Sequence, residues 1–305
     1  MITKSSFYST PVSRYAMLIC SWLLFAIIGA LLMSIIAGDG SVAARMRIAI
    51  VIQDLFLFII PAIVTAVFIT RKPAELLCIT KGFPIYSIVL VLMIMVVTAP
   101  AMQMLINFNQ SLSFPDWLEP VERWMRASEE AAAKSLEGVT GGTSWGSLIL
   151  SVLLVGVMAG FSEEIFFRGA LQRIMSTSGL APHIAIWVTA FIFSAMHLQF
   201  FGFLPRLILG AFFGYLLWWS GSLWLPVCAH ALNNTLAILS EWERQRMGDS
   251  LTIDASLVEN PGAHTWIIIL AGVALGAAML VYLRKMLLKG SVDAKRAASE
   301  VESGS

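Results

Sequence analysis

Two adjacent glutamates stand inside an apolar stretch of the chain. Glu163 and Glu164 follow Gly160-Phe161-Ser162 and precede Ile165-Phe166-Phe167, and Arg168 comes one helical turn later. A carboxylate inside a membrane-spanning helix is costly and by default marks a functional site. The structural alternative is a latch, in which a glutamate and the arginine only hold two helices together.

Helix geometry separates the roles of the two acids. Glu164 and Arg168 are four residues apart with the acid first, the favourable order for an ion pair. An unpaired arginine in apolar surroundings would be costly, so Arg168 is expected to neutralise and orient Glu164. Glu163 points about 100° away on the helix. Without that partner, and beside a like charge, it suits a general base.

Two further clusters carry polar groups that could act with Glu163. Phe193 and His197 share a helical face, and so do His230 and Asn234. Alone, the first could be a packing histidine and the second a hydrogen bond between helices. Together they offer a base, a second proton carrier and two oxyanion donors, which suits hydrolysis of a carbonyl bond by activated water. Ser162 is discounted as a nucleophile because adjacent helix positions do not face each other.

The same residue types could instead bind a metal. A glutamate and two histidines make an acceptable zinc shell with an open position for water. The ligands would be Glu163, Glu164, His197 and His230. The HExxH spacing is absent, so no cofactor is favoured and zinc is the alternative.

The composition predicts an all-α, polytopic membrane protein. Hydrophobic residues make up 58% of the chain and charged residues 13%, and the mean hydropathy is +0.81. Soluble domains carry about 25% charged residues. The net charge of +1 says nothing about nucleic acid, and the lack of a basic face argues against a nucleic-acid partner. The three cysteines form no CxxC pair and no disulfide framework.

A bilayer is crossed by about 20 apolar residues, and eight segments meet this length approximately. They are 15–36, 48–70, 84–106, 145–174, 183–200, 205–220, 223–239 and 264–283. A short interfacial helix is expected within the polar segment 107–143, an acidic loop at 241–262 and a basic tail after the last span. The predicted regions are an N-terminal membrane region (1–146), a catalytic core (147–240), and the loop, last span and tail (241–305).

An even number of spans places both termini on one side of the membrane. That side would collect most of the lysines and arginines of the short loops, including Arg71, Lys72 and Lys81. Such an excess marks the cytoplasmic side, so both termini are expected in the cytoplasm.

The ordered motifs resemble those of the CAAX protease and bacteriocin-processing family, also called CPBP or Abi. They are Glu163-Glu164-x-x-x-Arg168, Phe193-x-x-x-His197 and His230-x-x-x-Asn234. Phe167-Arg168-Gly169 and Gly221-Ser222-Leu223-Trp224-x-Pro226 agree as well. The resemblance covers about residues 147–240, and the flanking spans match only in being hydrophobic.

The resemblance implies an all-helical intramembrane endopeptidase whose site lies in a cavity open to the cytosol. It implies that Glu163 activates water with His197, and that His230 and Asn234 stabilise the oxyanion. Glu164, Arg168 and Phe193 would support the site. The family has been described both as glutamate proteases and as metalloproteases. A membrane or membrane-proximal peptide is the implied substrate, and closer similarity to bacterial members implies a bacterial inner membrane.

Two other classes of function use the same residues. In a non-catalytic immunity or scaffold protein they would form only a buried polar network. In a proton-coupled transporter they would form a relay, but no repeat pairs the two halves of the chain. Asp54, in the second span, is the one extra acid that could serve a relay. It is close in sequence to Arg47, so it is expected to reach the membrane interface instead.

Overall fold

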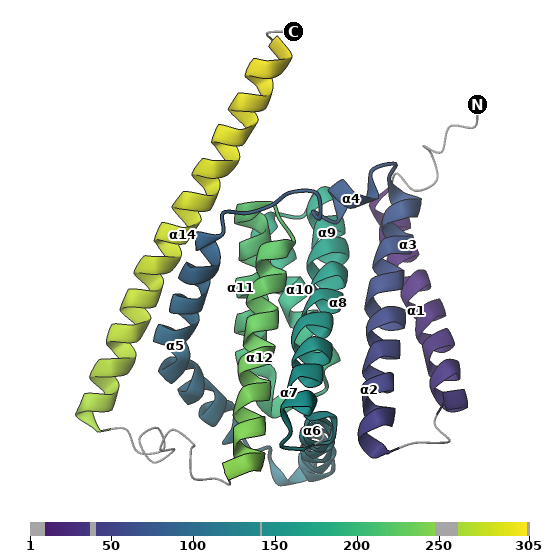
Figure 1. Cartoon of the computed structure of the whole chain (residues 1–305), viewed down its shortest axis with the longest axis vertical. Coiled ribbons are helices and arrows are strands. Elements are labelled where there is room, and N and C mark those ends of the chain that lie inside the picture. Colours follow the sequence, from purple (N-terminus) through teal and green to yellow (C-terminus); the bar gives the residue numbers. More distant parts are fainter. Residues whose placement is uncertain (1–9, 37–40, 141, 248–261, 304–305) are drawn as a thin grey trace.

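The computed structural model describes residues 10–36, 41–140, 142–247 and 262–303. Within these ranges every regular element is helical, which confirms the all-α prediction. The helices form eight consecutive rods that run alternately down and up in Figure 1. The start of the first rod and the end of the last therefore lie on the same side.

Some rods are single helices and others are joined from several helical segments. In chain order they are α1 (Pro11–Ile36); α2 (Val42–Gln53) with η1 (Asp54–Ile59) and α3 (Ile60–Ile69); α5 (Tyr86–Gln110); α7 (Trp145–Ser151) with η3 (Val152–Met158), α8 (Ala159–Glu164), η4 (Ile165–Gln172) and α9 (Arg173–Thr177); α10 (Pro182–Met196); α11 (Phe203–Ser220); α12 (Trp224–Met247); and α14 (Ala263–Ser303). The connecting elements are α4 (Pro73–Leu76), η2 (Asp116–Leu118), α6 (Glu119–Thr140) and η5 (Phe200–Gly202).

Six of the eight predicted spans are long and apolar enough to cross a membrane. They lie at Pro11–Ile35, Val42–Ile69, Tyr86–Gln110, Trp145–Thr177, Phe200–Ser220 and Ala263–Gly290. The fifth predicted span is the apolar helix Pro182–Met196, which is shorter than a full crossing of the bilayer needs. The seventh is the apolar first part of α12. The chain is thus polytopic, but the number eight is not confirmed.

Helices continue past two of the predicted boundaries. Helix α12 runs through Glu241 to Met247, so the predicted acidic loop begins as helix; residues 248–261 lie outside the described ranges. Glu241 accepts hydrogen bonds from Arg244 at 2.7 Å and Gln245 at 2.8 Å, which stabilise this last turn. Helix α14 likewise continues beyond the predicted span 264–283 to Ser303, through a tail rich in helix-forming Ala, Lys and Glu.

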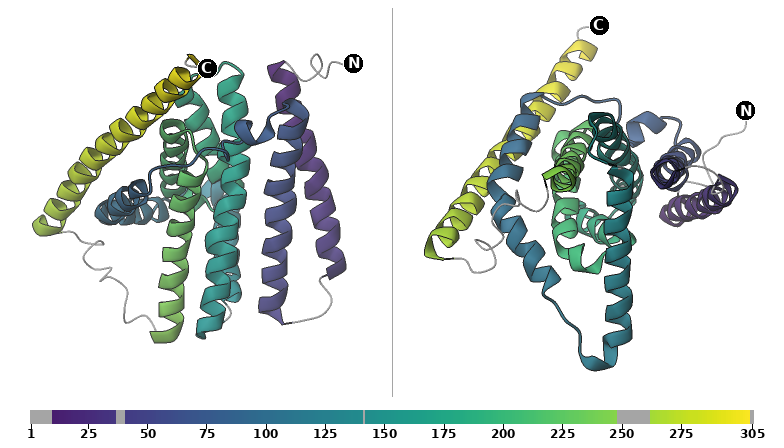
Figure 2. Two further views of the ribbon diagram at one scale, coloured as in Figure 1. Left: turned by 45° about the horizontal axis from the view of Figure 1, so that its top comes forward. Right: turned by 60° about the horizontal axis from the view of Figure 1, so that its bottom comes forward.

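The rods that carry the three motifs lie in the middle of the protein. In Figures 1 and 2, α1 and α2–α3 flank them on one side, and α5 and α14 on the other. Helix α10 packs on α11, and α12 packs on η3 and α8. The main core cluster includes Phe58, Phe166, Phe167 and Phe193, all at most 7% exposed. The candidate residues therefore sit beside the best-packed part of the fold.

Gly160 allows the close approach between α8 and α12. A Cβ atom there would lie 3.0 Å from the backbone nitrogen and 3.2 Å from the Cα of Ala231. Gly160→Ala is expected to lower the melting temperature of the detergent-purified protein, because overpacking a helix contact costs about 1–3 kcal/mol. Gly146→Ala is the matched control, since a Cβ there meets nothing within 4 Å. Equal melting temperatures for the two variants would contradict the tight contact.

Candidate functional site

Glu163, His197 and His230 come together from three helical rods. Glu163 lies on α8, His197 caps the C-terminal end of α10, and His230 lies on α12. Glu163 Oε2 is 3.8 Å from His197 Nε2 and 3.7 Å from His230 Nε2. The side chain of Glu163 is 13% exposed and that of His197 is 28% exposed. The acid and the two histidines predicted from separate motifs thus form one cluster.

Glu164 and Arg168 form the predicted ion pair. Arg168 Nη1 donates to Glu164 Oε1 at 2.6 Å, and both side chains are fully buried. The same oxygen accepts from His230 Nδ1 at 2.8 Å. Arg168 Nη2 donates to the carbonyl of Gly210 at 2.9 Å, and the guanidinium lies 4.5 Å from the centre of the Phe193 ring. Glu164 is therefore held on the side of the cluster away from Glu163.

The hydrogen bonds at Nδ1 define what each histidine presents to Glu163. His197 Nδ1 is 2.8 Å from the carbonyl of Phe193, which can only accept, so Nδ1 carries a proton. His230 Nδ1 faces the carboxylate of Glu164, and the same argument applies. In the neutral rings both Nε2 atoms are then acceptors that face Glu163 Oε2. That oxygen has no hydrogen-bond partner within the described ranges.

The two separations between Glu163 Oε2 and the histidine Nε2 atoms, 3.8 and 3.7 Å, are too long for direct hydrogen bonds. A water placed between Glu163 Oε2 and either Nε2 would donate one proton to each acceptor. A water held between a carboxylate and an imidazole in this way is what general-base activation needs.

Phe193 and Asn234 take different places around this cluster. The centre of the Phe193 ring lies 4.8 Å from that of the His197 ring and 5.8 Å from that of the His230 ring, so Phe193 packs against both histidines. Asn234 lies one turn beyond His230, and its Nδ2 donates to the carbonyl of Val155 at 3.1 Å. One of the two N–H bonds of Asn234 is used there, so the second is available to another acceptor.

The prediction that Asp54 reaches the membrane interface is wrong. Asp54 is 1% exposed, and it lies beside Ser162 and close enough to Glu163 for the two carboxyl groups to interact. It stands near the middle of the rod Val42–Ile69, too deep for a short side chain to reach water. Its Oδ2 finds no hydrogen-bond partner in the part of the chain that the structure describes. The sequence feature that could have indicated the burial of Asp54 is its position between two long apolar runs.

Helix α11 supplies contacts that the sequence motifs did not indicate. The carbonyl of Gly210 accepts the hydrogen bond from Arg168. A Cβ at Gly210 would lie 3.2 Å from both Ala190 and Phe193, so this glycine also allows close helix packing. The ring of Phe213 stacks on His230 with centroids 4.9 Å apart. No side-chain motif marks Phe213, because α11 is largely apolar.

One of the four ligands predicted for zinc, Glu164, already accepts hydrogen bonds from other side chains. Glu164 Oε1 accepts from both Arg168 and His230. Among the described residues, no group of three or more His, Cys, Asp or Glu side chains is arranged to hold a metal ion. The side chains in this arrangement thus do not fit a preformed zinc shell.

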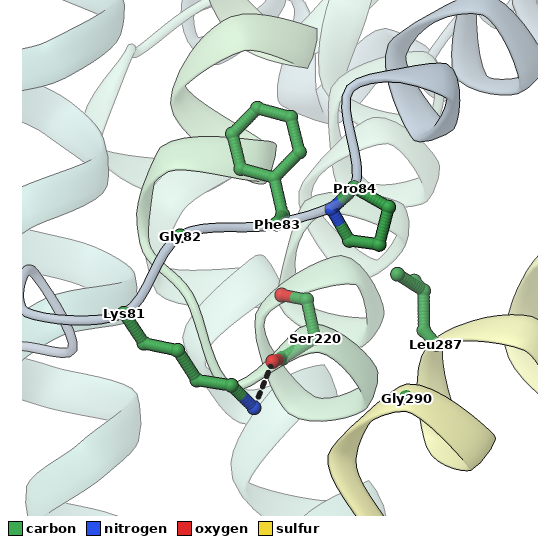
Figure 3. Close-up of a pocket in the computed structure, with 7 residues that line it drawn as sticks. All are labelled: Lys81, Gly82, Phe83, Pro84, Ser220, Leu287 and Gly290. Atoms are coloured by element: carbon green, nitrogen blue, oxygen red, sulfur yellow. Dashed lines mark hydrogen bonds between the residues drawn. The ribbon is translucent and has the colours of Figure 1, made fainter. Parts of the chain in front are cut away.

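Two cavities of the described chain lie away from Glu163. The first, of about 190 Å³, is lined by Lys81, Gly82, Phe83, Pro84, Ser220, Leu287 and Gly290 (Figure 3). Lys81 Nζ donates there to the carbonyl of Ser220 at 2.8 Å. The second, of about 240 Å³, is lined by Gln172 and Arg173, among other residues, on the rod that also carries Glu163. The cytosolic cavity implied by the family resemblance stays a prediction.

Comparison with known proteins identifies the segment that contains the cluster. Residues 145–236 match the family model described as type II CAAX prenyl endopeptidase Rce1-like. An uncharacterized protein of Bacillus subtilis (strain 168), YpbD, is 28% identical over 83 residues, which cover 26% of this chain and 39% of that relative. No solved structure matches the chain significantly. The predicted resemblance is confirmed for this segment: Glu163, His197, His230 and Asn234 all lie within the stretch that is similar to the Rce1-like family.

Proposed function

We propose that this chain is an intramembrane endopeptidase that hydrolyses a peptide bond with a water activated by Glu163 and His197. The observation that carries the proposal is the convergence of Glu163 Oε2 with the Nε2 atoms of two histidines, at 3.8 and 3.7 Å. The proposal places a shared water between these atoms. The Rce1-like match over residues 145–236 supports the same class of reaction.

In the proposed first step, a water lies between Glu163 Oε2 and His197 Nε2. Glu163 takes one proton as the water oxygen attacks the carbonyl carbon of the scissile bond. The carbonyl π bond opens, and the negative charge moves to its oxygen. His197 accepts the second water hydrogen as a hydrogen bond and so orients the attacking oxygen; its own Nδ1–H stays on the Phe193 carbonyl.

In the second step, the oxyanion collapses and the C–N bond breaks. Glu163 returns the proton to the leaving nitrogen, so the carboxylate is regenerated. We assign stabilisation of the oxyanion to His230 and Asn234. Asn234 offers its second N–H bond. His230 can donate from Nε2 only as an imidazolium, which the hydrogen bond from its Nδ1 to Glu164 would stabilise.

The proposed substrate is a membrane or membrane-proximal peptide. The bilayer surrounds the apolar rods, so a peptide would reach Glu163 from the membrane or along it. Prenylation of the substrate is suggested only by the name of the matching family. No nucleic acid and no metal take part in the proposed reaction.

We also propose a bacterial inner membrane with both termini in the cytoplasm. Basic residues join the rods at one end of the protein: Arg14 contacts Thr177 at 3.3 Å, Arg173 contacts Leu76 at 3.3 Å, and Lys81 contacts Ser220 at 2.8 Å. Their gathering at that end supports a cytoplasmic orientation for it.

The proposal is tested with detergent-purified protein and a panel of fluorogenic peptides, some prenylated and some not. Each peptide is incubated with and without a chelator, and Glu163→Gln serves as the control. We expect cleavage that survives chelation and disappears in Glu163→Gln. Cleavage lost on chelation and restored by zinc would overturn the metal-free mechanism and leave the endopeptidase assignment standing.

A second candidate function is a non-catalytic membrane scaffold or immunity protein. It is favoured by one observation: Glu164, Arg168 and His230 form a buried hydrogen-bonded network, which could serve the fold alone. In that case no peptide is cleaved, and Glu163→Gln behaves as the wild type in a cellular phenotype that depends on the protein.

A further inference from the structure

The turn that follows His197 adopts a backbone conformation that needs external support. His197 is the C-terminal cap of α10, and Leu198 directly after it has φ of 54°. A residue with a side chain pays about 1–2 kcal/mol for this left-handed conformation. Such a residue persists only where its surroundings over-determine the backbone. The position of His197 therefore depends on what holds residues 198–204.

Asn109, at the end of α5, holds this turn from one side. Its Oδ1 accepts from the backbone N–H of Leu204 at 2.7 Å, and its Nδ2 donates to the carbonyl of Phe200 at 3.0 Å. Asn109 is only 2% exposed, so both hydrogen bonds lie away from water. One side chain thus bridges the first residue of η5 and the first turn of α11.

Helix α6 holds the same turn from the other side. Glu129 Oε2 accepts from the backbone N–H of Phe201 at 3.0 Å. The guanidinium of Arg126, one turn earlier, lies 4.2 Å from the centre of the Phe201 ring. The ring of Trp124 lies 5.4 Å from that of Phe200. Three side chains of α6 therefore contact two consecutive residues of the turn.

Arg206 closes the network from α11. It donates from Nη1 to the carbonyl of Gln199 at 3.3 Å and from Nη2 to the side-chain oxygen of Gln199. Glu129 and Arg206 also interact electrostatically, on either side of Gly202. A Cβ at Gly202 would lie 3.2 Å from Arg206 Nη2 and 3.4 Å from Glu129 Oε1. Gly202 leaves the space in which these two side chains meet.

Two other ion pairs of α6 show how its side chains behave where they only meet solvent. Glu130 pairs with Lys134 at 2.6 Å, and Glu119 with Arg123 at 3.6 Å; the four side chains are between 66% and 71% exposed. Such pairs contribute little to stability. Glu129 and Glu130 are thus neighbours in the chain with different surroundings: one binds the turn beside His197, and the other faces outward.

We propose that Glu129 and Asn109 are positioning residues for His197. The contacts that α6 makes with the turn after His197 keep His197 Nε2 facing Glu163. This inference rests on the proposed function and assigns a role to the polar segment between α5 and α7. Neither residue touches the reacting atoms. Each acts through the backbone of residues 199–204, which sets where α10 ends.

The test compares Glu129→Ala with the conservative Glu129→Gln and with the matched control Glu130→Ala. The side-chain oxygen of glutamine can still accept from the Phe201 N–H, so Glu129→Gln is expected to keep near wild-type activity. Glu129→Ala is expected to lower kcat about 10–100-fold with little change in KM, because small misplacements of a catalytic group have effects of that size. Glu130→Ala is expected to match the wild type. Asn109→Ala is the second variant and is made after Glu129→Ala, because removing the buried side chain of Asn109 also removes two hydrogen bonds of the fold.

Two readouts separate this inference from the proposed function. Hydrogen exchange reports the protection of the Phe201 amide, and it is expected to fall in Glu129→Ala alone. NMR of the four histidines reports the Nδ1–H of His197, identified with His197→Ala, and this signal is expected to shift in the same variant. If the wild type cleaves no peptide, the proposed function fails while these two measurements still decide the positioning role. The positioning role would be overturned if Glu129→Ala left the His197 signal unchanged. It would also be overturned if this variant exchanged the Phe201 amide faster but kept its kcat.

Discussion

Glu163→Gln is expected to abolish peptide cleavage while leaving the fold intact. The amide cannot take the proton from the attacking water or return it to the leaving nitrogen, and general-base catalysis contributes about 10²–10⁴-fold. Glutamine has nearly the same shape, and Glu163 Oε2 makes no hydrogen bond among the described residues that the change would break. The loss should appear in kcat, measured by steady-state cleavage of the best peptide of the panel. The melting temperature should stay within error of the wild type.

His197→Ala is the companion variant for this experiment, because it removes the second acceptor of the proposed water. Both variants should lose activity without losing abundance. Cleavage retained in Glu163→Gln would rule out Glu163 as the base, whatever its distance from the histidines. A parallel loss of folding and activity would instead assign Glu163 to the structure of the bundle.

Arg168→Met is expected to have the largest effect on stability. Arg168 is the fully buried partner of the fully buried Glu164, at 2.6 Å. Methionine fills much of the space but leaves a buried carboxylate with no cation. Breaking a buried pair in this way costs about 3–5 kcal/mol. The variant should therefore be made in lower amounts and melt at lower temperature in detergent.

The double variant Glu164→Gln with Arg168→Met tests the cause of this loss. It removes the stranded charge, so it should recover part of the stability that Arg168→Met loses. Arg123→Met is the surface control, because the Arg123–Glu119 pair is 3.6 Å long and its side chains are 71% and 66% exposed. That change should have a small effect. Equal losses for the buried and the surface variant would contradict the pairing argument.

The two predictions separate the adjacent glutamates by their expected effects. Glu163 should matter for cleavage and little for stability, because its Oε2 is left without a hydrogen-bond partner in the described structure. Glu164 should matter for stability, because its Oε1 receives both Arg168 and His230. Through His230, loss of Glu164 should also lower activity, but it should do so together with the melting temperature.

The sequence by itself determined the features that follow from one helix. The Glu164–Arg168 pair could be predicted because the spacing of four residues and the pitch of a helix set their distance. The membrane class followed from composition, since 13% charged residues cannot cover a water-soluble domain of this length. The ordered motifs also identified the segment that later matched the Rce1-like family.

Tertiary structure decided everything that depends on how the rods pack. Whether Glu163 meets His197 and His230 depends on close contacts such as that of Gly160 with Ala231, which no spacing within one helix determines. Asp54 looked interfacial when judged by its neighbours in sequence, yet it is buried beside Ser162 and Glu163. Distances along a helix are local and are set by the backbone. Distances between helices are the summed result of all side chains packed between them, so they could not be predicted from one segment at a time.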